Sequence, residues 1–175
     1  MTQSQESVPE LQAIANFTQK SGQLSNQNSS TNSLYEQDFM LWIEKTVDLL
    51  RQQKFTELDL ENLIEEIEDM SMSQRSALRS NFTVILLHLL KWKYQPEKRT
   101  NSWKSSIREH RMRIRDQFKD SPSLKRYFVE IFVKCFQDAR ELAADETGLK
   151  LEIFPEESPF SLDEVLDPDF LPEYA

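Results

Sequence analysis

The stretch FTVILLHLLKW (residues 82–92) is apolar at almost every position and decides the fold class. A surface helix is apolar along one stripe only, whereas a helix that is apolar almost all round is covered by neighbours on several sides. The stretch therefore predicts a central helix, which ends by Pro96 because the residue before a proline disfavours helical backbone. The chain contains only two glycines, a composition that favours long helices over many tight hairpins.

Apolar residues recur at spacings of three and four on both sides of this stretch, the periodicity of amphipathic helices. Five helices are expected, and they begin at Ser33, at Asp59, after a break at residues 71–73, near Ser102 and at Ser121. The last should stop at Gly148, because glycine adopts the left-handed conformation that ends many helices. Neither strand alternation nor an internal repeat is visible, so the sequence predicts an all-α antiparallel bundle of about five helices.

The two ends of the chain differ from its middle in composition. Residues 1–32 are rich in Gln, Ser, Asn and Thr and bury too little apolar surface to offset chain entropy, which predicts a disordered arm. Residues 33–150 should form the helical bundle domain. Residues 151–175 are punctuated by prolines and predict an extended acidic tail that packs on the bundle, with one short helix capped by Ser161 and Glu164.

Composition excludes several classes of protein. Phosphate-cradling loops and dinucleotide-binding turns need several glycines, so we expect neither a P-loop nor a Rossmann site. Cys135 is the only cysteine, which rules out an intramolecular disulfide and a cysteine-based zinc cluster and favours a reducing, cytoplasmic setting. The apolar runs are too short to span a bilayer, and no secretory signal is expected.

The charge of the chain is unevenly divided. Residues 91–126 hold twelve basic and four acidic side chains, a net of +8, while the remainder holds nine basic and twenty-six acidic side chains, a net of −17. The total of −9 thus combines a basic middle with acidic arms. Such polarisation favours binding of partners that carry complementary charge.

Two rows of opposite charge have matching helical spacing. The basic row consists of Lys104, Arg108, Arg111 and Arg115, and the acidic row consists of Glu61, Glu65 and Glu68. One interpretation is a ladder of ion pairs, within one chain or across a dimer, that sets register more than stability. The alternative is that the basic row binds nucleic-acid phosphates while nearby aromatic residues stack on bases.

Other charged side chains are candidates for a catalytic or metal site. A di-metal bundle site needs Glu-x-x-His motifs, but the residues three before His88 and His110 are isoleucines, so no metal site and no cofactor is predicted. Both histidines fall on apolar faces, where a histidine is most often a core residue with one hydrogen-bonded ring nitrogen. A hydrolytic or metal-dependent enzyme built from Glu65, Glu66 and His88 is the weakest alternative, and no catalytic residues are assigned.

Several motifs occur together in a characteristic order: YEQD at 35–38, DLENLIEEIE at 59–68, HLLKW at 88–92, DSPSL at 120–124, ETG at 146–148 and DFLP at 169–172. Through them the chain resembles, over residues 34–173, the bacterial and largely cyanobacterial family catalogued as domain of unknown function twenty-nine. The resemblance implies a compact helical protein and assigns no activity, cofactor or partner. Members often carry Cys-Pro-aromatic where this chain has Ser158, so a thiol role is absent there.

The resemblance also picks out signature positions, which join the charged side chains in one candidate polar cluster. The signature positions are Asp59, Glu65, Glu66, His88, Lys91, Trp103 and Arg108, and the candidate cluster is Asp59, Glu65, Glu66, His88, Lys91, Arg108 and Arg111. The leading interpretation is a non-enzymatic protein–protein interaction or regulatory module, which binds another protein or itself. A nucleic-acid-associated regulator is the alternative.

Overall fold

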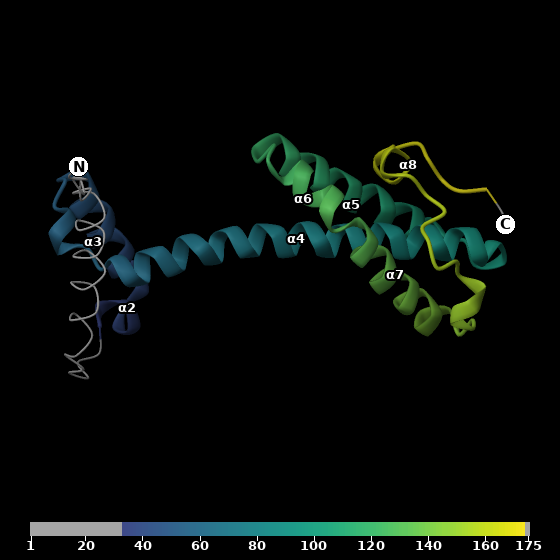
Figure 1. Cartoon of the computed structure of the whole chain (residues 1–175), viewed down its shortest axis with the longest axis horizontal. Helices are drawn as coiled ribbons and strands as arrows, with labels where there is room; N and C mark the ends of the chain where they lie inside the picture. The colour runs from purple at the N-terminus through teal and green to yellow at the C-terminus, as the bar shows by residue number, and fades with distance from the viewer. Residues whose placement is uncertain (1–32, 174–175) are drawn as a thin grey trace, which may run out of the picture. The chain divides into compact units, whose positions relative to one another are not determined.

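A computed structural model describes residues 33–173 of the chain (Figure 1). Within these residues the secondary structure is helical throughout, without a β-strand, which confirms the all-α prediction. The arm predicted for residues 1–32 lies outside the described residues. The α-helices are α2 (Leu34–Gln37), α3 (Phe39–Arg51), α4 (Leu60–Tyr94), α5 (Asn101–Asp120), α6 (Leu124–Glu130), α7 (Phe132–Thr147) and α8 (Leu162–Leu166), and 3-10 turns lie at Phe55–Glu57, Pro96–Lys98 and Leu151–Ile153.

The predicted break at residues 71–73 is wrong, because α4 continues through it as one helix of 35 residues. Serine lowers helix propensity by only a few tenths of a kcal/mol relative to good helix formers. The segment contains neither proline nor glycine, so nothing interrupts the helix once it is nucleated. Two polar residues around Met72 therefore mark an exposed segment of the helix and not its end.

The described chain divides into two compact units, the first ending at Asn62 and the second beginning at Leu63. In the first unit, the Ser33 hydroxyl accepts a hydrogen bond from the Glu36 backbone N–H (3.3 Å), as the predicted cap requires. The Asp38 carboxylate then accepts from the Leu41 N–H (3.0 Å) and starts a new helix. The first predicted helix is therefore two helices, α2 and α3.

The core of the second unit forms around the second half of α4, as the apolar stretch predicts. Leu78, Phe82, Ile85 and Leu89 are completely buried there. In Figure 1 helices α5, α6 and α7 flank this half of α4, and the Phe82 ring stacks on Phe128 of α6 at 4.0 Å between centroids. The central position of residues 82–92 is therefore confirmed.

The predicted fifth helix begins later than Ser121 and is interrupted. The Ser121 N–H closes the last turn of α5 by donating to the Gln117 carbonyl (2.8 Å), so Ser121 ends one helix and does not cap the next. Helix α6 begins at Leu124, and a junction at Ile131 separates it from α7. Helix α7 stops at Gly148, whose φ of 71° is left-handed, as predicted.

The last part of the described chain packs its apolar residues into the core of the second unit. Phe154, Phe160 and Val165 are buried with the helices. The short helix α8 begins with the predicted capping box, in which Ser161 and Glu164 hydrogen-bond to each other's backbone N–H. Among the described residues, no helix has the length and apolar content needed to cross a membrane.

Candidate functional site

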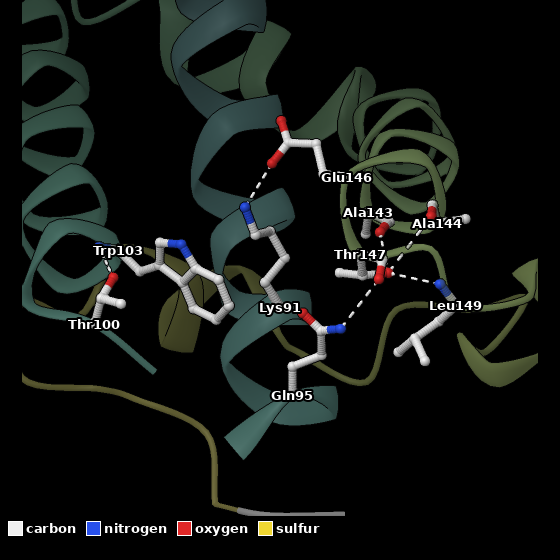
Figure 2. A network of polar contacts seen from close by, with 9 residues as sticks. All are labelled: Lys91, Gln95, Thr100, Trp103, Ala143, Ala144, Glu146, Thr147 and Leu149. Carbon is white, nitrogen blue, oxygen red and sulfur yellow. Dashed lines mark hydrogen bonds and ion pairs between the residues drawn. The ribbon is translucent and has the colours of Figure 1, made fainter. Parts of the chain in front are cut away.

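Lys91 places a buried ammonium group at the meeting point of three helices (Figure 2). Its side chain is 9% exposed, and Nζ lies 2.5 Å from a carboxylate oxygen of Glu146 on α7. On its other side, Nζ lies 4.6 Å from the centre of the Trp103 ring on α5. The ion pair and the cation–π contact together offset the cost of removing the ammonium from water. Lys91 thus joins α4, α5 and α7.

A set of hydrogen bonds holds the end of α7 beside this ion pair (Figure 2). The Gln95 side-chain amide donates to the Thr147 carbonyl at 3.3 Å. The Thr147 hydroxyl donates to the Ala143 carbonyl (2.6 Å) and accepts from the Leu149 N–H (3.2 Å). The bond from Gln95 satisfies the Thr147 carbonyl, which has no partner inside the helix, and the set holds Glu146 one residue away.

His88 lies one turn before Lys91, with its ring 6.5 Å from that of Trp103. The pKa of His88 is lowered from 6.5 to about 4, chiefly by burial and to a smaller extent by the Lys91 ammonium, while the Glu146 carboxylate opposes both effects. The imidazole is therefore neutral at pH 7. No described group forms a hydrogen bond with its buried Nδ1, in contrast to the predicted bonded ring nitrogen.

His110 follows the prediction for a core histidine more closely. Its Nδ1 lies 2.7 Å from the Asn81 side-chain oxygen, so this nitrogen carries the proton and donates it. Burial is the main cause that lowers the pKa of His110, with a smaller contribution from Arg113. Both histidines are thus neutral residues that belong to the helix packing.

The two charged rows do not form a ladder within the chain. In residues 33–173 no ion pair includes Glu61, Glu65 or Glu68, and none includes a member of the basic row. Most of the ion pairs that do form join residues four apart on one helix. A ladder across a dimer remains a prediction.

Arg111 of the basic row is buried, with 1% of its surface exposed. Its guanidinium donates to the carbonyls of Val165 (Nε, 2.7 Å), Phe170 (Nη1, 2.9 Å) and Glu164 (Nη2, 3.2 Å). Burial lowers the pKa of Arg111 to about 10. Arg111 is therefore held within the fold and does not project from the surface with the rest of the basic row.

Sequence spacing does contain a signal for the burial of Arg111. It lies four residues after Ile107 and three before Ile114, both buried, and so belongs to the apolar face of α5. Lys104, Arg108 and Arg115 are exposed on the same helix. The predicted basic row is therefore divided between one buried and three exposed side chains.

The remaining candidate residues are distributed along α4. Asp59 precedes the helix, where its carboxylate accepts hydrogen bonds from the Asn62 side chain (2.7 Å) and from the Trp42 indole N–H (3.3 Å). Glu65 is exposed and Glu66 is partly buried. The structure brings Lys91 and His88 together with Glu146, which the candidate set omitted although the ETG motif contains it. In residues 33–173, no three His, Cys, Asp or Glu side chains are grouped so that they could hold a metal ion.

A different feature of α4 concerns its apolar stripe. Ile64, Ile67 and Met70 follow each other at spacings of three on the helix face that leads to the buried Leu78 and Phe82. They are 55%, 58% and 65% exposed. We call Ile64, Ile67 and Met70, with the adjacent carboxylates Glu65 and Glu68, the acidic–apolar face.

Comparisons with known proteins give one match. No curated protein and no solved structure matches the chain. The family model described as "Domain of unknown function DUF29" matches residues 34–171, which is most of the chain. The chain therefore belongs to the family described as Domain of unknown function DUF29.

Proposed function

We propose that this protein is a non-enzymatic interaction module, whose acidic–apolar face on α4 binds a basic amphipathic helix of a partner protein. The observation that carries the proposal is the exposure of Ile64, Ile67 and Met70. Eight residues after Met70, Leu78 begins the completely buried part of the same helix face. Complete burial of each large apolar side chain contributes about 1.5–3 kcal/mol, so a partner that covers the face gains substantial free energy.

The charge around the face specifies the chemistry of the partner. Between Lys54 and Arg75 the chain has no basic residue and seven acidic ones, Glu57, Asp59, Glu61, Glu65, Glu66, Glu68 and Asp69. Glu65 and Glu68 form no ion pair within the described residues. A partner helix with Leu or Ile on one face and Lys or Arg beside it would complement both the apolar and the acidic side chains.

The two alternatives have less support. A nucleic-acid-binding row would have to work with Lys104, Arg108 and Arg115 alone, because Arg111 is bound to three carbonyls. A hydrolytic site would need a general base whose pKa is near neutral pH, whereas burial is the main reason that the pKa of His88 is about 4. A cytoplasmic location is part of the proposal, since the single thiol of Cys135 is free and buried.

The proposal is tested with a labelled model peptide in a fluorescence anisotropy titration. The peptide has about 18 residues, enough for five helical turns, with leucine on one face and lysine elsewhere. A twin peptide carries glutamate in place of lysine. We expect the lysine peptide to bind and the glutamate twin to fail.

The variants locate the binding surface. Ile64→Ser/Ile67→Ser should weaken binding by about tenfold or more. Val129→Ser/Val133→Ser is the matched control, because these valines are exposed to a similar degree on α6 and α7. Equal loss in both variants, or no loss in either, would contradict the proposal. A concentration-dependent dimer that disappears in Ile64→Ser/Ile67→Ser would mean that the face binds a second copy of the chain and not a partner helix.

A further inference from the structure

A hollow of about 120 Å³ lies between α5 and the segment that follows α8. Its charged lining comes from Lys104, Arg108, Arg111 and Asp169, and apolar side chains such as Leu171 complete the wall. The three cations and one carboxylate give a net charge of +3 − 1 = +2. The hollow is thus a small, positively charged site in a chain whose overall charge is −9.

Two of the three cations are free to bind a ligand. Neither Lys104 nor Arg108 forms an ion pair or side-chain hydrogen bond within the described part of the chain. They lie four residues apart on α5, so their charges face each other across one turn and repel. An anion bound between them would remove this repulsion.

The third cation, Arg111, also lines the hollow. Arg111 is buried, and its described partners are neutral carbonyl oxygens with no carboxylate at ion-pair distance. A guanidinium has five N–H donors, and three are used by these carbonyls. The carboxylates of Asp167 and Asp169 oppose the effect of burial on Arg111 without reaching ion-pair distance, so an anion bound beside the guanidinium would stabilise it further.

We infer that the hollow binds a phosphate group, as inorganic phosphate or as the phosphate of a small ester. The volume of about 120 Å³ admits a group of five heavy atoms. Arginine and lysine together are the usual ligands of phosphate oxygens, because their hydrogen bonds to an anion are short and strong. The wall charge of +2 matches the charge of a phosphate dianion.

The same residues also explain why the basic helix α5 suits a single phosphate group better than a nucleic-acid strand. A nucleic-acid site requires a row of accessible cations along the backbone path. Here Arg111 is buried, and Asp169 adds a negative charge to the lining of the hollow. A single phosphate group can enter such a site, whereas a continuous strand cannot follow it.

The test is isothermal titration calorimetry of the full chain with inorganic phosphate, at constant ionic strength held by chloride. We expect saturable binding that weakens about tenfold in Lys104→Gln/Arg108→Gln. The control Arg115→Gln/Lys119→Gln removes the same charge with the same spacing from the same helix, outside the hollow, and should bind as the unchanged protein does. Asp169→Asn should strengthen binding, because it removes the only carboxylate of the wall.

Two results would overturn the inference. Equal weakening in the test and control variants would mean that only the overall charge matters. Acetate that binds as well as phosphate, or no saturation with phosphate, would mean that the hollow is not a phosphate site. A single-stranded oligonucleotide of about ten nucleotides is titrated as well, and tighter binding with a steep salt dependence would replace the inference with the nucleic-acid alternative.

Discussion

Replacing Glu146 by glutamine should destabilise the protein by leaving a buried charge without its partner. The change keeps the shape of the side chain but removes the negative charge 2.5 Å from the Lys91 ammonium. The ammonium keeps only its contact with the Trp103 ring at 4.6 Å. Because Lys91 is 9% exposed, water cannot fully replace the lost carboxylate.

The expected magnitude follows from the burial of the two partners. Breaking a fully buried ion pair costs about 3–5 kcal/mol, and an exposed pair contributes about 0–1 kcal/mol. Glu146 is 47% exposed, so the pair lies between these limits and we expect a loss of about 1–3 kcal/mol. Lys91→Met should cost less, because it removes the buried charge itself and leaves an apolar side chain against Trp103.

The assay is a double-mutant cycle measured by urea unfolding with far-UV circular dichroism. In the Lys91→Met background, Glu146→Gln should cost less than about 0.5 kcal/mol, which gives a coupling energy of about 0.5–3 kcal/mol. The control is Glu141→Gln, an exposed glutamate of the same helix, expected within about 0.5 kcal/mol of the unchanged protein. If Glu146→Gln costs the same with and without Lys91, the reasoning about the buried ammonium is refuted.

Three further predictions concern pH, the end of α7 and the continuity of α4. The pKa of His88 is lowered from 6.5 to about 4 in the folded protein, so the unfolded state binds more protons between these values and stability should fall as pH falls from 6.5 to 4. His88→Gln should reduce this slope in urea midpoints measured across the range, and an unchanged slope would exclude His88 as its source. Gly148→Ala should reduce the free energy of unfolding, measured by thermal unfolding, by about 1–2 kcal/mol, because the φ of Gly148 is 71°. Gly148→Asn should cost less, because asparagine tolerates this conformation better. Equal losses in the two variants would point to another cause. Met72→Pro should reduce the free energy of unfolding by about 3 kcal/mol or more and lower the helical content, whereas Met72→Ala should do neither. Similar effects of the two variants would argue against a continuous α4.

Most of the helices could be predicted because their signals are local. Gly148 ends α7, and Ser161 with Glu164 starts α8, since each acts through backbone groups within one turn. The prediction of a break at residues 71–73 was wrong for a related reason. Serine is a weak signal unless a neighbouring residue removes a hydrogen bond or allows a left-handed turn, and none does here.

The candidate site could be predicted only in part, because its contacts join distant parts of the chain. The sequence points to Lys91 and His88, but their partner Glu146 lies 55 residues beyond Lys91. Periodicity assigns a residue to a face without saying what covers that face. This is why Ile67, on an apolar stripe, is exposed, while Arg111, with a charged side chain, is buried.

The acidic–apolar face and the phosphate hollow require opposite ligand charges and use different helices. The first uses Ile64 and Ile67 of α4, and the second uses Lys104 and Arg108 of α5, with no residue in common. Variants of sites that share no partner should act independently. Ile64→Ser/Ile67→Ser should therefore leave phosphate binding unchanged, and Lys104→Gln/Arg108→Gln should leave peptide binding unchanged. Loss of both activities in either variant would indicate altered folding instead of a lost ligand contact, and circular dichroism of that variant would identify it.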